Sequence, residues 1–317
     1  MMLKLLKNTH SYLILLFLFI NTSFFLIDFV LERSEFPLYD FHMSNVFWVS
    51  ICMLLLSFHC IGLNNIVHEK DVIKKPNFVT AFVFLMLCTP FNLNPINNLV
   101  SLILLFFLSF ILKLHKKKSP FKAIYNASII LSICSLMIPE VLFLSVLIII
   151  SSMIFRNISL RVFLIVILGV STPYIFIYTY KYLFDLNFKI LQFKLNSISY
   201  INISDYYISI VNNDYKLSWY VCVFIIILFS TIEIFNWMYK KSAKSRESFI
   251  IIICYLIILC LVAVFFYSSS SLYLCLTPLS IIISNFFVYH RRSYLSEIIF
   301  ILFVFISIFY RVSMINL

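Results

Sequence analysis

Four carboxylates follow one another closely in the first polar segment of the sequence. They are Asp28, Glu32, Glu35 and Asp40, with Arg33 among them. A carboxylate that lies beside an acceptor hydroxyl group can act as a general base, so this cluster is a candidate catalytic site. The competing interpretation is a solvated acidic loop without chemistry, because acidic residues contribute little to membrane orientation and are tolerated on the outer side.

Glu140 is a second candidate, because it follows Pro139 at the tip of a hairpin between two apolar runs. A carboxylate buried in a membrane is a candidate proton or cation site. A carboxylate in the first turn of a helix is also favoured by the helix dipole and by the free backbone N–H groups there. The sequence supports both interpretations of Glu140.

Two arginines, Arg156 and Arg161, flank the next polar turn. A guanidinium group binds phosphate through two parallel hydrogen bonds, so both are candidate contacts for lipid head groups. The preference for basic residues in cytoplasmic loops explains them equally well. No metal or cofactor is predicted, because the eight cysteines lie in apolar runs without a C-x-x-C pair and two glycines are too few for a phosphate loop.

The elements that must position these residues are membrane helices. Apolar residues make up 63% of the 317 residues and charged residues only 12%, against about 25% in a soluble domain. The core of a soluble protein of this size could not hold so much apolar surface, so lipid must be the solvent. Apolar runs without strict alternation predict helices rather than a barrel. We therefore expect an all-α transmembrane bundle that forms a single integral membrane domain over residues 1–317.

The basic residues predict the orientation of these helices. A cytoplasmic N-terminus places 18 of the 24 Lys and Arg residues on the cytoplasmic side. This partition accounts for the net charge of +11, so no nucleic-acid partner is predicted. We expect about eleven spans, or as few as nine where short pairs form re-entrant hairpins. The expected helices cover residues 11–31, 44–66, 78–91, 96–114, 123–138, 141–155, 162–184, 218–239, 249–267, 272–289 and 294–310.

Two further features concern the shape of the bundle. Residues 185–217 form the longest polar segment and contain several tyrosines, so we expect one or two interfacial helices on the outer side. The expected helix 162–184 contains Gly169 and Pro173. Proline removes a backbone hydrogen bond, so we expect this helix to bend there.

Several stretches resemble a family of uncharacterised polytopic inner-membrane proteins of Bacteroidota, which is sometimes mislabelled as a carotene oxygenase. They are YNASIILSICSLMIPEVLFL (125–144), RNISLRVFL (156–164), GVSTPY (169–174) and LTPLSIIISNFFVYHRRSYLSEIIFILF (276–303). The resemblance runs over most of the chain in order. It implies a location in the bacterial inner membrane, within the cell envelope, and it implies no mechanism. The sequence shows no histidine set that would bind iron for an oxygenase.

Three hypotheses for function follow. The first is a non-catalytic envelope-assembly or partner subunit that binds membrane lipids and another membrane protein, because the loops are short and known motifs are missing. The second is an enzyme acting on lipid-linked sugars, similar in layout to C-type glycosyltransferases or glycan polymerases. Those enzymes place a catalytic carboxylate in the first outer loop, which is longer than the acidic segment here. The third is a transporter, which would need broken helices and internal repeats.

The predicted orientation can be measured with reporter fusions. A reporter placed after Lys118 or Lys241 should be cytoplasmic, and one placed near Asn202 should be outside the cell, because of the partition of basic residues. Labelling of a cysteine at position 202 from the cytoplasm alone would contradict this topology.

Overall fold

The structure is a computed structural model, and it describes the chain over most of its length. The described residues are 2–7, 11–30, 45–75, 77–91, 94–115, 120–184, 214–239, 241–266, 268–290 and 293–313. Within these ranges the chain is helical apart from short connections, and it contains no strand. The all-α prediction is therefore confirmed for the described residues.

The helices follow the apolar runs of the sequence. Each expected range corresponds to a helix, but 78–91 forms a shorter one and 141–155 begins as a 3₁₀ helix. The elements are α1 (Met2–Leu6), α2 (Ser11–Val30), α3 (Asn45–Glu69), α4 (Val79–Leu87), α5 (Pro95–Leu112), α6 (Phe121–Met137), η1 (Pro139–Leu144), α7 (Ser145–Ile154), α8 (Leu160–Leu183), α10 (Asp214–Met238), α11 (Ala243–Phe266), α12 (Ser269–Tyr289) and α13 (Ser293–Ser313).

Seven of the described helices are long and apolar enough to cross a membrane, namely α3, α5, α8, α10, α11, α12 and α13. The protein is thus built as a multi-pass membrane protein. The apolar parts of α2, of α6 and of the η1–α7 pair are shorter. The count of about eleven spans and the cytoplasmic N-terminus stay predictions, and most of the expected interfacial segment 185–217 lies outside the described residues.

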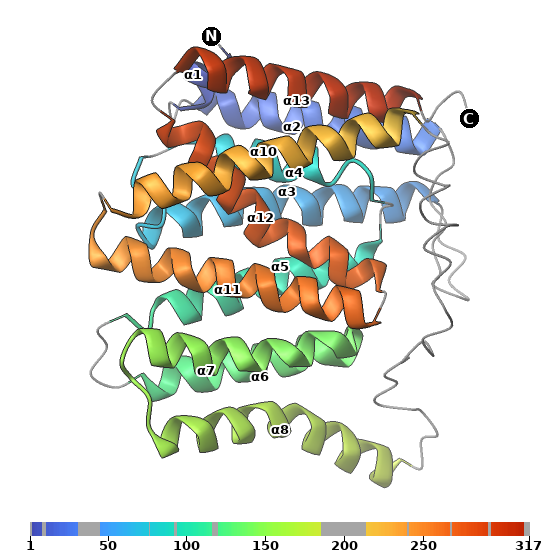
Figure 1. The fold of residues 1–317 in the computed structure, drawn as a ribbon. Coiled ribbons are helices and arrows are strands. Elements are labelled where there is room, and N and C mark those ends of the chain that lie inside the picture. The colour runs from blue at the N-terminus through green and yellow to red at the C-terminus, as the bar shows by residue number, and fades with distance from the viewer. Residues whose placement is uncertain are drawn as a thin grey trace.

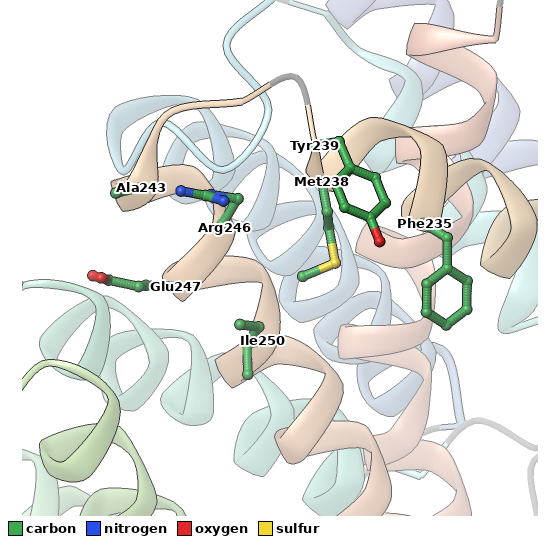
Figure 2. Close-up of a pocket in the computed structure, with 7 residues that line it drawn as sticks. All are labelled: Phe235, Met238, Tyr239, Ala243, Arg246, Glu247 and Ile250. Atoms are coloured by element: carbon green, nitrogen blue, oxygen red, sulfur yellow. The ribbon is translucent and has the colours of Figure 1, made fainter.

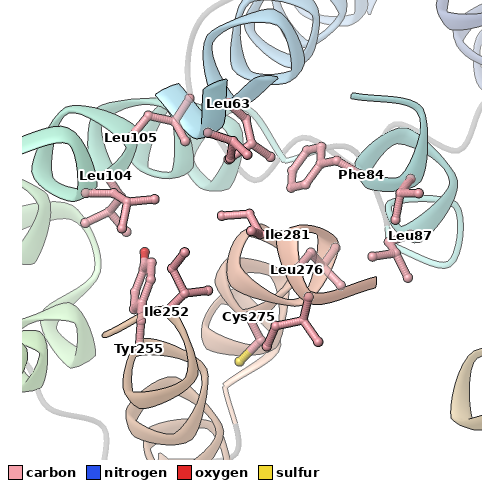
Figure 3. Packing of buried hydrophobic residues seen from close by; sticks show 14 of the residues in the cluster. Leu63, Phe84, Leu87, Leu104, Leu105, Ile252, Tyr255, Cys275, Leu276 and Ile281 are labelled. Carbon is pink, nitrogen blue, oxygen red and sulfur yellow. The ribbon is translucent and has the colours of Figure 1, made fainter. Parts of the chain in front are cut away.

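Helix α12 is the centre of the bundle. It runs obliquely through the middle of the helices, which extend from α13 and α2 at one edge to α8 at the other (Figure 1). It packs against α11, α10, α4, α5 and α13, and 89% of its most apolar 18-residue stretch is buried. Figure 3 shows the packing around it, with side chains from α3, α4, α5 and α11 closing on Cys275, Leu276 and Ile281.

Helix α4 is short, and all nine of its residues are buried. At 1.5 Å per residue it is about 14 Å long, about half of the hydrocarbon thickness of a membrane. A helix that is apolar on every side belongs in a core, and its polar start must be paired there. The Asn77 side chain accepts a hydrogen bond from the Val79 N–H at 3.1 Å, and the Thr80 hydroxyl donates to Asn64 Oδ1 on α3 at 3.0 Å.

Several of the segments predicted to be cytoplasmic meet at one end of the bundle, at the left in Figure 1. Lys244, at the start of α11, pairs with Asp71, just after α3, with 2.6 Å between Nζ and Oδ2. The backbone N–H of Lys74 donates to the hydroxyl of Tyr289, at the end of α12, at 3.0 Å. The fold therefore places these segments on one side, as the predicted alternation requires.

Helix α8 approaches α6 closely at Gly169. A Cβ atom at this glycine would lie 2.0 Å from the Ser128 hydroxyl oxygen and 2.8 Å from Ser128 Cβ. Small residues let membrane helices approach in this way and exchange hydrogen bonds. The Ser132 hydroxyl donates to the Val170 carbonyl at 2.7 Å, and the hydroxyls of Ser135 and Tyr174 are 2.6 Å apart. The ribbon of α8, which contains Pro173, is bowed in Figure 1.

The substitution Gly169→Ala tests this contact. We expect it to destabilise the protein by about 1–3 kcal/mol, since the added methyl group has no room against Ser128. Gly62→Ala is the matched control, because its methyl group would meet only the tip of Leu105 at 3.2 Å. Both changes bring the same gain in helix propensity, about 1 kcal/mol, so the difference between the two variants measures the clash. Thermal unfolding in detergent provides the comparison, and equal melting temperatures would contradict the close contact.

Candidate functional site

A groove lies between the end of α10 and the start of α11, and its volume is about 440 Å³. The α11 residues that line it recur at intervals of three and four, so they share one face of the helix. Sequence analysis did not single out this face, although the spacing is visible in the sequence. The lining residues, drawn in Figure 2, are Phe235, Met238 and Tyr239 from the end of α10, and Ala243, Arg246, Glu247 and Ile250 from α11.

Two charged residues, Arg246 and Glu247, lie at the polar end of this groove. Glu247 is held by His115, just after α5, with 2.9 Å between Oε2 and Nδ1. Arg246 is exposed, and its guanidinium group makes no hydrogen bond or ion pair with the residues that the structure describes. The groove therefore offers a cation whose hydrogen-bond donors remain available beside a carboxylate that already has a partner.

The other described basic residues near the groove are engaged. Lys244 donates to Asp71, and this hydrogen bond holds the pKa of the Asp71 carboxyl below its usual range. The Ser245 hydroxyl donates to the Asp71 carbonyl at 2.8 Å, so the start of α11 is fixed to the end of α3. Lys241 lies over the Tyr289 ring at 4.0 Å, and partial burial lowers the pKa of its ammonium group. Arg246 thus differs from its basic neighbours.

The four acidic candidates lie mostly outside the described part of the chain. Asp28 is in the last turn of α2, but its side chain is not described, and Glu32, Glu35 and Asp40 fall within residues 31–44. The structure therefore does not test this cluster. Its catalytic role stays a prediction.

The remaining candidates are described. Glu140 is half-buried in the first turn of η1, the position expected for a helix N-terminal acid. Arg156 follows α7 with a positive φ of 58°, and Arg161 is in the first turn of α8; both side chains are exposed. Between them, Asn157 Nδ2 donates to the Leu114 carbonyl at 2.9 Å, which fixes this turn to the end of α5. Lipid binding by the two arginines stays a prediction.

A second group of polar side chains lies inside the bundle, between α3, α4, α5 and α12. The Tyr273 hydroxyl donates to Asn98 Oδ1, and both side chains are buried. The His59 ring stacks on Phe84 with 4.2 Å between ring centroids. Thr277 Oγ1 lies 3.5 Å from His59 Nε2. These contacts join α3, α5 and α12 by polar groups that lipid could not satisfy.

No metal centre is found among these groups. Within the described ranges, no three His, Cys, Asp or Glu side chains lie close enough together to hold a metal ion.

Another pair connects α10 with α12, because Glu233 Oε2 lies 3.0 Å from His290 Nδ1. The sequence could not reveal this pair, since its members are 57 positions apart and separated by α11.

The pair of Tyr273 and Asn98 can be measured with a double-mutant cycle. We expect Tyr273→Phe to cost about 0.6–2 kcal/mol of stability, because it leaves the buried Asn98 oxygen without its donor. Adding Asn98→Ala to the tyrosine variant should cost less than Asn98→Ala alone, since the partner is already gone. Unfolding in detergent gives the four stabilities, and strictly additive costs would show that the two side chains do not interact.

Comparison with known proteins gives one result. No curated protein and no solved structure matches the chain significantly. One family model, described as a family of unknown function (DUF6427), matches residues 1–317. That description agrees with the resemblance to an uncharacterised family noted from the sequence. Since the match extends over all 317 residues, the protein belongs to the DUF6427 family.

Proposed function

We propose that this protein is a non-catalytic partner subunit of an envelope assembly in the bacterial inner membrane. The observation that carries the proposal is the position of α8. It lies at one edge of the bundle and packs mainly against α6, with a smaller contact on α7 (Figure 1). Only 17% of its most apolar 18-residue stretch is buried. Apart from the side that contacts α6 and α7, this 24-residue helix therefore faces the membrane.

The contact between α8 and α6 involves only one side of α8, and it holds α8 in a fixed position. The close approach at Gly169 and the hydrogen bonds from Ser132 and Ser135 fix its position and rotation against α6. The outer face therefore has a fixed shape, with Leu164, Leu168 and Ile175 all more than half exposed. A fixed apolar face is suited to packing against another membrane helix, because such packing depends on shape rather than on a hydrophobic driving force.

The interior of the bundle supports the same proposal over the alternatives. An enzyme acting on lipid-linked sugars or a transporter needs a polar site that a substrate can enter. The described centre around α12 is instead packed mostly with apolar side chains (Figure 3), and its buried side chains Tyr273 and Asn98 pair with each other. The basic residues gathered at one end of the helices agree with insertion into the inner membrane, where the positive-inside rule applies.

A pair of matched variants tests the role of α8 in the native bacterium. The triple variant Leu164→Ala, Leu168→Ala and Ile175→Ala should lose a specific membrane-protein partner and the phenotype that the intact protein supports. The control variant Ile257→Ala, Leu261→Ala and Phe265→Ala removes comparable exposed side chains from α11 and should retain both. Cross-linking from position 168, with identification of the cross-linked protein, measures the partner directly.

Three outcomes contradict the proposal. Equal effects of the two triple variants would show that both helices contact only lipid. Cross-linking from position 168 to lipid alone would show the same. If neutralising Asp28, Glu32, Glu35 or Asp40 singly abolishes the phenotype at normal protein abundance, the hypothesis of an enzyme acting on lipid-linked sugars replaces the partner-subunit hypothesis.

A further inference from the structure

We propose that the groove between α10 and α11 binds one anionic phospholipid, with the phosphate group on Arg246 and part of an acyl chain along Phe235, Met238 and Ile250. This site is separate from α8 and does not depend on the proposed partner role. The volume of about 440 Å³ lies within the range of sites that hold small ligands.

The charge distribution favours an anion at the polar end of the groove. Arg246 is the described basic residue there without an intramolecular partner, whereas Lys244 is bound to Asp71 and Lys241 lies over the Tyr289 ring. A guanidinium group presents two parallel N–H donors, which match two oxygens of a phosphate. The carboxylate beside it, Glu247, contacts His115 with 2.9 Å between Oε2 and Nδ1, so it does not occupy the guanidinium group of Arg246.

The rest of the groove favours a lipid over a free phosphate ion. The α10 side contributes Phe235, Met238 and Tyr239, and Ile250 continues the apolar lining one turn deeper along α11. Methionine is a flexible side chain that adapts to an irregular apolar partner. These residues lie where two membrane helices end, which is the depth of phospholipid head groups. On the predicted cytoplasmic side, anionic lipids give the membrane surface a negative potential.

The positive-inside rule alone explains why a basic residue occurs in this turn. It does not explain why the described residues leave this arginine unpaired at the end of an apolar groove while they engage Lys241 and Lys244. The combination of an available guanidinium group, a paired carboxylate and an apolar lining is what an amphiphile with one negative charge requires.

Native mass spectrometry of the full-length protein in detergent tests the site. Phosphatidylglycerol, phosphatidylcholine and inorganic phosphate are titrated in separate experiments. We expect one phosphatidylglycerol molecule to be retained more tightly than phosphatidylcholine or inorganic phosphate. Arg246→Gln should weaken that binding about tenfold or more, since a charged hydrogen-bonding group is lost. Arg246→Lys keeps the charge without the paired donors and should give an intermediate loss.

Two matched controls accompany these variants. Lys122→Gln removes an exposed basic residue from the start of α6 and should leave the tight site unchanged. Ile250→Trp fills the groove and should weaken lipid binding, whereas Ile257→Trp places the same side chain on an exposed position outside the groove and should not. If Arg246→Gln lowers the melting temperature, the Ile250→Trp and Ile257→Trp pair still decides the question.

Each of the following results overturns the proposal. Equal retention of phosphatidylcholine would indicate general lipid contact, and equal binding of inorganic phosphate would indicate a simple anion site. Equal losses from Arg246→Gln and Lys122→Gln would show that only net charge matters. Unchanged phosphatidylglycerol binding in Ile250→Trp would show that the groove is not occupied by the lipid.

Discussion

The packing of α12 is the constraint on which the rest of the bundle depends. Lipid supplies no hydrogen bonds, so only the protein itself can pair polar groups in the interior. Helix α12 is almost wholly buried and still carries Tyr273 and Thr277. The surrounding helices must therefore bring polar partners to matching depths, as α5 does with Asn98 and α3 with His59. The short helix α4 fills the space that remains beside it.

The sequence was sufficient to predict the helices, because each must satisfy its own backbone within one apolar run. The boundaries of α5, α6 and α8 agree closely with the predicted ranges. The partners across helices could not be predicted, since apolar runs carry no information on rotation or depth. Glu233 pairs with His290, 57 positions away, and nothing in its own apolar run indicates this partner. The sequence connected Gly169 with a bend in α8. The structure shows that the missing side chain of Gly169 leaves room for Ser128 of α6.

The groove between α10 and α11 could not be predicted from the sequence either. Arg246 stood among the basic residues that set orientation, and nothing in its local sequence distinguished it from Lys241 or Lys244. The difference comes from the fold, because Asp71 and Tyr289 reach the two lysines from α3 and α12. The four acidic candidates were visible from sequence because they are adjacent in the chain. Their chemistry depends on residues 31–44, which lie outside the described part.

Exposed apolar side chains are expected all over a membrane protein, so exposure alone marks no site. A functional surface needs a second feature that lipid contact does not explain. For α8 that feature is rigidity, since Gly169 and two serine hydroxyls fix an outer face that lipid would accept in any rotation. For the groove it is Arg246, a charge that the described residues leave unpaired. The two surfaces are thus suited to different partners. The fixed apolar face of α8 selects a partner by shape, and the guanidinium group at the end of the apolar groove selects an anionic lipid.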